Sequence, residues 1–242
     1  MKAYIKENFI QQLSIDCVIF GYDDRQLKVL VAKLAFKGDF WVLPSGFVLQ
    51  DEGIDQAAHR ILEERTGFKD IFLEQYHVFG DVPRTNMAVI EKISELNREK
   101  LDAATISDID LEWLKKRFIA IGYYALVDIN KVVPKLMAID ESIDWYEITE
   151  LPQLISDHPE QVSRALEALR LNLDSKLLGF NLLSQKFTMK ELQHLYEAVY
   201  DRPFRRNNFQ KKMLDLEVLE RLEKKYTGAA NKAPYLYRFK PA

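Results

Sequence analysis

The segment from Gly46 to Phe68, GFVLQDEGIDQAAHRILEERTGF, holds the side chains whose types and spacing most clearly suggest chemistry. Glu52 and Glu64 could bind Mg²⁺, because this hard cation prefers carboxylate oxygens as ligands. Residues three and four apart share one face of a helix, so positions 61, 64 and 65 lie around one site. Ile61 and Arg65 add no carboxylate there, and an arginine keeps its positive charge. The segment therefore predicts weak metal binding.

This spacing resembles the Nudix box, G-x5-E-x7-R-E-U-x-E-E-x-G-U, where U is a bulky apolar residue. The matching positions are Gly46, Glu52, Arg60, Leu62, Glu64, Gly67 and Phe68. Ile61 and Arg65 stand where the family has glutamates. The resemblance implies a Nudix fold that keeps its pocket and has lost hydrolysis, with no catalytic residue, no metal site and no cofactor. One alternative stays open, in which Arg65 lies on a solvated face and the remaining glutamates bind metal weakly.

Charge divides the 242-residue chain into two unequal parts. Residues 1–172 contain 20 Lys and Arg against 29 Asp and Glu, a net charge of −9, whereas residues 173–242 contain 14 against 8, a net charge of +6. We therefore expect two domains with this boundary, and a polyanionic partner for the smaller, basic one.

Cysteine content and hydropathy indicate in which cellular compartment the protein is expected. Cys17 is the one cysteine of the chain, so no disulfide can form within it, and this fits a reducing cytosol. The first residues contain no apolar signal core, and no apolar run approaches the ~20 residues that span a bilayer. We expect a soluble, cytoplasmic protein without a membrane partner.

The first part of the chain alternates strand and helix patterns. Strands are predicted at 14–20, 27–34, 41–43, 72–79, 117–127 and 145–148, and amphipathic helices at 55–65 and 158–173. Strands mixed with helices around one sheet predict an α/β fold, an α/β/α sandwich. The polar stretch 85–116 is longer than an ordinary connection and contains a possible helix from 87 to 101. It is either a solvated excursion, or a dimer contact or lid.

The basic second part predicts a winged helix. Thr188 caps a helix over 189–200, with Glu191 completing a capping box. A second helix begins near Arg205, and segments 218–225 and 235–239 can pair as a wing across the loop 227–232. Arg and Asn side chains suit base edges, while Lys suits phosphates. The predicted DNA-binding residues are Thr188, Lys190, Arg205, Arg206, Asn207, Asn208, Gln210, Lys211, Tyr237 and Arg238. The alternative is a small helical domain with a solvated cationic face.

The whole chain resembles the Nudix-related transcriptional regulators, in which a Nudix domain senses a metabolite and a winged helix binds operator DNA. The resemblance lies in the segments FWVLPSGFV (40–48), FGDVPR (79–84), IGYYALV (121–127), 186–214 and LYRF (236–239). One branch of this family senses ADP-ribose and regulates NAD metabolism, and another senses a pentose. The chain most resembles the arabinose-responsive branch typified by AraR, through Ser45 and the insertion after Arg84. This implies a homodimeric repressor of sugar-utilisation genes that binds double-stranded operator DNA.

A pentose site needs hydrogen-bonding groups spaced for adjacent hydroxyls and an apolar surface for the C–H face of the sugar. The candidate residues are Phe40, Ser45, Phe47, Glu64, Asp81 and Arg84. ADP-ribose would instead require cationic or backbone N–H contacts to a diphosphate, which Arg60, Arg65 and Arg84 could supply. L-arabinose and ADP-ribose thus both remain candidate effectors. A Mg²⁺-dependent hydrolase of nucleoside diphosphate derivatives, with Glu52 and Glu64 as its metal ligands, is the alternative from another class.

Overall fold

The computed structural model describes most of the chain. The described residues are 8–23, 25–69, 71–82, 84, 87–99, 111–174, 182–225 and 233–240. In that part of the chain, no helix is both long enough and apolar enough to cross a membrane.

The larger domain is built on one mixed β-sheet. Its strands are β1 (Phe9–Asp23), β2 (Gln26–Leu34), β3 (Trp41–Val42), β4 (Ser45–Leu49), β5 (Leu73–Phe79), β6 (Ile119–Asp128) and β7 (Asp140–Glu147). The main path runs β3-β2-β1-β6-β5, with β4 paired to β1 and β7 paired to β2. β1 and β6 are parallel over ten residue pairs, whereas the β1–β2 hairpin is antiparallel, as the sequence predicts.

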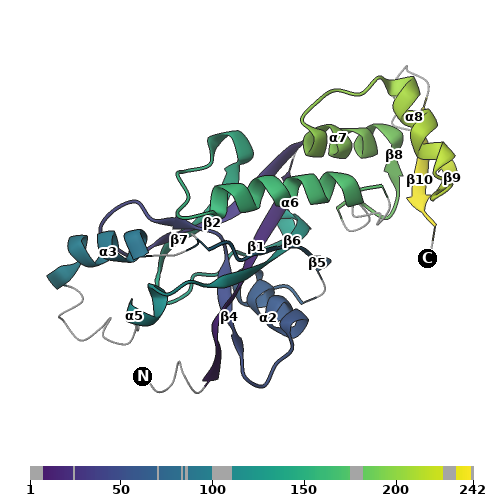
Figure 1. The fold of residues 1–242 in the computed structure, drawn as a ribbon. Coiled ribbons are helices and arrows are strands. Elements are labelled where there is room, and N and C mark those ends of the chain that lie inside the picture. Colours follow the sequence, from purple (N-terminus) through teal and green to yellow (C-terminus); the bar gives the residue numbers. More distant parts are fainter. Residues whose placement is uncertain are drawn as a thin grey trace.

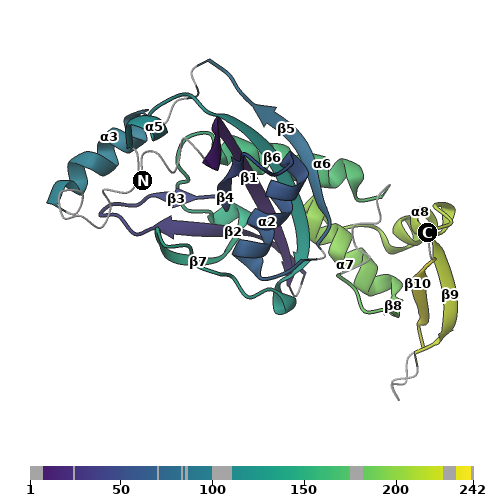
Figure 2. The same ribbon diagram turned by 90° about the horizontal axis from the view of Figure 1, so that it is seen from below.

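Helices cover both faces of this sheet. Along β1, Ile15, Cys17 and Ile19 pack with α2 (Ile54–Thr66). The alternate residues Val18 and Phe20 belong to a second cluster with α6 (His158–Asn172). This alternation follows from the two-residue period of a strand. Figures 1 and 2 show α2 and α6 on opposite faces of the sheet, which confirms the predicted α/β/α sandwich.

The insertion differs from its predicted form. The helix α3 (Met87–Leu96) ends at a turn at Asn97, Arg98 and Glu99 are again helical, and the predicted end at 101 lies outside the described residues. A short helix, α5 (Leu111–Leu114), precedes β6. Ile90 and Ile93 are buried against β2 and β3 in a third apolar cluster. Of the two interpretations left open, a solvated excursion does not describe α3, because one of its faces belongs to the core. Residues 100–110 lie outside the described part.

The smaller domain is a winged helix. It comprises β8 (Phe187–Thr188), α7 (Met189–Tyr200), α8 (Arg206–Asp215), β9 (Leu219–Lys224) and β10 (Tyr235–Phe239), with strand order β8-β10-β9. Thr188 and Glu191 form both bonds of the predicted capping box. The predicted wing pairing is confirmed, while the loop 227–232 at its tip lies outside the described residues.

The two domains share part of one core. Leu169 and Leu173 from the end of α6 belong to the same buried cluster as Leu192 and Leu195 of α7. A side chain of α6 is also bonded to the backbone of α7: Arg170 Nε donates to the carbonyl oxygen of Val199 at 2.9 Å. In both views the winged helix lies at one end of the molecule, and α3 lies at the other (Figures 1 and 2).

Candidate functional site

Arg60 organises the acidic residues of the Nudix-like segment. Its Nε and Nη2 donate to the two carboxylate oxygens of Glu52 at 2.9 and 2.6 Å, and Nη1 lies 3.3 Å from Glu64. Nη2 also donates to the carbonyl oxygen of Phe47 at 2.8 Å. The Arg60 hydrogen bond, acting against desolvation, holds the pKa of Glu52 below its ordinary value. Glu52 is further engaged by the backbone N–H of Leu49 at 2.8 Å.

Arg65 is buried, which contradicts the alternative of a solvated face. Its side chain is 4% exposed and pairs through Nη1 with Asp140, whose side chain is 1% exposed. The same Asp140 oxygen accepts the backbone N–H of Met137 at 2.8 Å. Arg65 therefore links α2 to the start of β7 through a buried, charge-assisted contact.

The Nudix fold implies a Mg²⁺ site on α2, and the residues present do not fit one. Ile61 is 1% exposed and packs on Gly46, where an added Cβ would lie 2.7 Å from Ile61 Cγ1. Glu52 is occupied by Arg60, and the guanidinium of Arg65 is held nearby. Within the described residues, no group of three or more His, Cys, Asp or Glu side chains is placed to hold a metal ion.

A cavity of about 420 Å³ lies beside these residues. Its polar lining comes from Ser14, Asp16, Ser45, Arg60, Glu64, Arg65, Arg84, Asp140 and His158, and its apolar lining from Phe9, Leu34, Val42, Phe47, Leu114, Phe118, Met137, Ala138, Ile139 and Ile155. Volumes of this order are typical of small-molecule sites, which combine apolar walls with a few placed polar groups.

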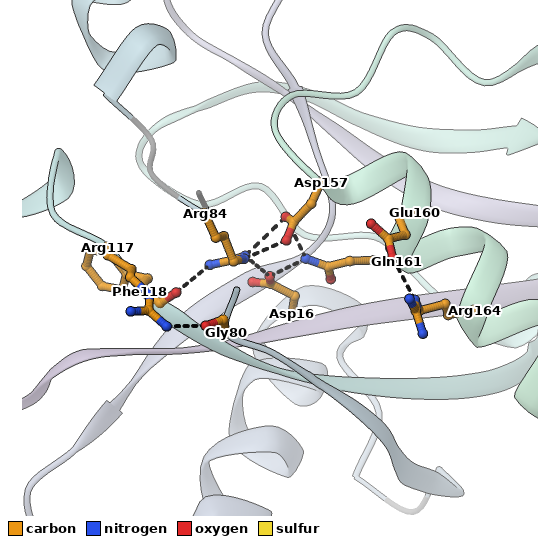
Figure 3. Close-up of polar contacts among 9 residues, drawn as sticks. All are labelled: Asp16, Gly80, Arg84, Arg117, Phe118, Asp157, Glu160, Gln161 and Arg164. Atoms are coloured by element: carbon orange, nitrogen blue, oxygen red, sulfur yellow. Dashed lines mark hydrogen bonds and ion pairs between the residues drawn. The ribbon is translucent and has the colours of Figure 1, made fainter. Parts of the chain in front are cut away.

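Arg84, which lines the cavity, is the centre of a polar cluster. Figure 3 shows the contacts of Arg84 with Asp16, Asp157 and Phe118. Its Nε donates to Asp157 at 2.6 Å and its Nη2 donates to Asp16 at 3.2 Å. Gln161 Nε2 from α6 donates to Asp16 at 2.8 Å and to Asp157 at 3.1 Å. Nη1 of Arg84 reaches the carbonyl oxygen of Phe118 at 3.2 Å. The cluster thus joins β1, the segment before α3, the start of β6 and the first turn of α6.

Burial and charge set the protonation of two groups beside this cluster. Burial lowers the pKa of His158, against the opposing charges of Asp16 and Asp157. The neutral imidazole accepts the backbone N–H of Leu43 through Nδ1 at 3.0 Å. Burial alone would raise the pKa of Asp157, but the hydrogen bond and charge of Arg84, together with Gln161 and His158, hold that pKa below the ordinary value.

The structure gathers four of the six predicted ligand residues. Ser45, Phe47, Glu64 and Arg84 line the cavity. Phe40 does not: it is 3% exposed and packs in the core with α3, so its assignment to the site is corrected.

Asp81 also lies outside this cavity. It lines a second hollow of about 530 Å³ beside α6, together with Arg84 and Asp157. Sequence reasoning missed Asp16 and Asp140 among the lining residues of the first cavity. Their signal was weak, since each stands alone in a strand.

The winged helix carries a third hollow, of about 580 Å³, between α7, α8 and the wing. It is lined by Thr188, Met189, Lys190, Gln193, His194, Arg206, Gln210, Lys224, Ala233, Pro234, Tyr235 and Tyr237. None of these lining residues is a carboxylate. A concave cationic surface beside the second helix of a helix-turn-helix suits a phosphate backbone.

The predicted DNA-binding residues divide into three groups. Thr188, Lys190, Arg206, Gln210 and Tyr237 line the hollow, and Thr188 and Tyr237 are themselves 8% and 4% exposed. The exposed residues Arg205, Asn207, Asn208 and Lys211 lie outside the hollow, at the first turns of α8. Arg238 is exposed, and its Nε pairs with Glu220 at 2.7 Å.

The fold defines a class of protein: a Nudix-type α/β domain joined to a C-terminal winged helix. The NUDIX domain model matches residues 11–165, and the chain belongs to the Nudix family. A model described as the NrtR DNA-binding winged helix domain matches residues 179–239.

Individual proteins resemble the chain over nearly its whole length. The ADPR responsive transcriptional repressor NtrR of Acinetobacter baylyi is 25% identical over 247 residues, which cover 99% of this chain and 86% of that protein. The crystal structure of Shewanella oneidensis NrtR superposes with a TM-score of 0.68 at 24% identity, over 95% of this chain and 94% of that chain. A MutT/nudix family protein from Enterococcus faecalis gives a TM-score of 0.66 at 18% identity, over 96% and 87%.

Proposed function

We propose that this protein is a ligand-responsive DNA-binding transcriptional repressor that acts as a homodimer on a two-fold operator. The observation that carries the proposal is the unpaired cationic face of the winged helix. Lys190, Arg206 and Lys211 are exposed and form no ion pair within the described part of the chain. Such side chains are free to neutralise phosphates, and a dimer presents two copies of the face to adjacent half-sites. The protein would act where the DNA lies, in the cytoplasm.

The Nudix domain serves as a sensor in this proposal, without hydrolysing its ligand. Arg60 already pairs with Glu52, and Arg65 lines the same cavity as Arg60 and Glu64. A cation there would meet a fixed positive charge and few free oxygens. The similar A. baylyi protein is described as a repressor, which agrees with a regulatory role.

Helix α6 provides a physical route from the cavity to the winged helix. Its first turn contributes Gln161 to the Arg84 cluster. Its last turn is bonded to α7, because Tyr200 Oη donates to the carbonyl oxygen of Arg170 at 2.9 Å. A ligand that changes the Arg84 cluster can therefore bias the position of α7, provided it binds the two states with different affinity.

ADP-ribose is the effector that the comparisons favour. The A. baylyi relative is described as ADPR responsive, and a cavity of about 420 Å³ has the size of a site for a nucleotide-sized ligand. On this proposal the protein regulates genes of NAD metabolism. The arabinose preference drawn from Ser45 and the insertion finds no such support among these relatives.

One observation keeps a pentose as the second candidate. The three arginines that line the cavity are each paired with carboxylates: Arg60 with Glu52, Arg65 with Asp140, and Arg84 with Asp157. A diphosphate would have to compete for these guanidinium groups, whereas an uncharged sugar such as L-arabinose would not.

A thermal-shift screen followed by DNA release tests the proposal. L-arabinose, other pentoses, hexoses, ADP-ribose and NAD are added to the full-length protein, because a ligand that binds only the folded form raises its melting temperature. The stabilising compound should then release the protein from a duplex selected from a random DNA pool. By linkage, that duplex must weaken ligand binding by the same factor. A protein that selects no duplex is not the proposed repressor.

A further inference from the structure

The Arg65 guanidinium has unused hydrogen-bond donors although its side chain is 4% exposed. Nη1 pairs with Asp140, while Nε is buried with no hydrogen-bond partner among the described residues. Arg65 also lines the cavity of about 420 Å³. A buried donor that lacks an acceptor is unfavourable, so a ligand oxygen that reached this guanidinium would be stabilised there.

Asp140 determines what kind of oxygen suits Arg65. The two side chains form a buried pair with no net charge, and Asp140 is fixed in turn by the backbone N–H of Met137 at 2.8 Å. The pair therefore offers direction and donors but little net positive potential. Asp16 and Glu64 line the same cavity, and their charges are met by Arg84 and Arg60, so these residues also add little net potential. An uncharged hydroxyl fits these surroundings better than a phosphate does.

A sugar also needs an apolar surface, and an aromatic cluster in the cavity provides one. Phe47 and Phe118 line the cavity, with their ring centroids 5.8 Å apart. Trp113 packs behind both, at 4.7 Å from Phe47 and 4.8 Å from Phe118. Hydroxyl-binding groups combined with aromatic faces are what a sugar ring needs, because its C–H face is apolar and its edge is polar.

We propose that Arg65 is a specificity-determining residue that donates hydrogen bonds to a hydroxyl of a pentose ring. The ring is either a free pentose or the terminal ribose of ADP-ribose, whose hydroxyl chemistry is shared. This inference rests on the proposed sensor function of the cavity. It gives the departure at position 65 a role of its own: a side chain that cannot hold a metal recognises the ligand.

Arg65 is also bonded to the segment that precedes and begins β7, which forms one rim of the cavity. The backbone N–H of Lys135 donates to the carbonyl oxygen of Arg65 at 2.9 Å, and Asp140 follows the rim residues Met137, Ala138 and Ile139. A ligand held by Arg65 therefore contacts the segment that begins β7 as well as α2.

The test compares two paired substitutions in the full-length protein. Arg65→Met with Asp140→Asn removes the donors without leaving a buried charge unpaired, and the new amide can still accept the Met137 N–H. Arg164→Met with Glu160→Gln is the matched control. Arg164 and Glu160 also form an Arg–carboxylate pair, at 2.7 Å, but they are exposed and line the other hollow. Arg65→Lys serves as a second variant if the first fails to fold.

Calorimetry with L-arabinose, D-ribose, ADP-ribose and ADP shows whether the bound ring is a free pentose or the terminal ribose of ADP-ribose. We expect the wild type to bind either a free pentose or ADP-ribose, the latter more tightly than ADP. The Arg65 variants should lose at least tenfold in affinity for that probe, with ADP and the control pair unaffected. DNA binding by the same variants should stay unchanged.

Four results would overturn the inference. They are equal affinity in the Arg65 variants, an equal loss for ADP and ADP-ribose, a loss in the control pair, and a wild type that binds none of the probes. The second result would indicate a phosphate contact, and the third would place the ligand in the other hollow. If the protein still binds DNA selectively, the repressor proposal stands in each case. A failure of the Arg65 inference is therefore distinguishable from a failure of the proposed function.

Discussion

The cavity of the Nudix domain and the DNA-facing surface of the winged helix use arginine in opposite ways. In the cavity, Arg60, Arg65 and Arg84 are each paired with carboxylates, and Arg65 and Arg84 are largely buried. On the winged helix, Arg205 and Arg206 are exposed at the start of α8 and form no ion pair in the described part of the chain.

The difference teaches what each charge is for. A buried guanidinium stays charged, so it must be paired to offset the cost of its desolvation; it then shapes the cavity and contributes little net potential. An unpaired, exposed guanidinium keeps its field and can exchange water and salt ions for phosphates. Net charge along the sequence shows only the second use, which explains why the basic domain was visible there and the cavity was not.

The largest effect is expected where a buried pair is reversed. Arg65→Glu would place a carboxylate against Asp140, with both groups buried. Losing the partner of a buried charge costs about 3–5 kcal/mol, and repulsion adds to this. Urea denaturation should therefore show a loss in the free energy of unfolding of at least about 3 kcal/mol.

The control is Arg164→Glu on the exposed face of α6, where a loss below about 1 kcal/mol is expected. The Arg65 variant also resembles a restored Nudix box. Tight Mg²⁺ binding with unchanged stability would contradict the role given to this pair.

A smaller effect is expected on the winged helix, at the exposed start of α8. Replacing Arg206 or Asn208 with Ala should reduce discrimination between operator and random DNA by about 1–3 kcal/mol if the side chain reads a base edge. Lys190→Ala and Lys211→Ala should weaken both kinds of DNA alike. Fluorescence anisotropy with both duplexes measures this difference, and a winged helix that none of the four substitutions affects does not bind DNA through this face.

Acid should lower the stability of the protein through the buried His158 beside the cavity. Since burial lowers the pKa of His158 in the folded state, the unfolded chain binds a proton below about pH 6.5 that the folded chain does not bind. Stability is then complete above that pH and falls as pH drops, by at most about 1.4 kcal/mol per unit, until the folded-state pKa is reached. His194 is shifted in the same direction, also through burial.

His158→Asn separates the two histidines. Its amide oxygen can accept the Leu43 N–H, and it does not titrate. Chemical denaturation between pH 7 and 5.5 should show a weaker pH dependence in this variant than in the wild type. An identical slope would assign the acid sensitivity to His194 or to another group.

Local sequence signals predicted most of the fold. The capping box of α7 forms as its residues indicate, and the period-two pattern of β1 places alternate side chains on the two helical layers. These features depend on residues a few positions apart, which a sequence displays directly.

The cavity was only partly predictable, because its partners are remote in sequence. Asp140 lies 75 positions from Arg65, and Asp157 lies 73 positions from Arg84. Nothing local distinguishes a buried arginine from one on a solvated helix face. Phe40 shows the converse error: its neighbours resemble the family segment, yet its ring is needed to cover α3.

The smallest effect is expected at Arg238, an arginine of the winged helix that is paired with a carboxylate, as the arginines of the cavity are. Arg238 was predicted to bind DNA, but its Nε pairs with Glu220 at 2.7 Å, whereas Lys190 has no acidic partner in the described residues. Binding measured over a range of salt counts the phosphates neutralised, since each changes the slope of log K against log salt by about 0.9. Lys190→Ala should therefore flatten the slope by about one phosphate, and Arg238→Ala should leave it unchanged. Glu220→Gln frees Arg238 and should steepen the slope. If Arg238→Ala flattens the slope as much as Lys190→Ala does, pairing within the protein does not decide which cations meet DNA.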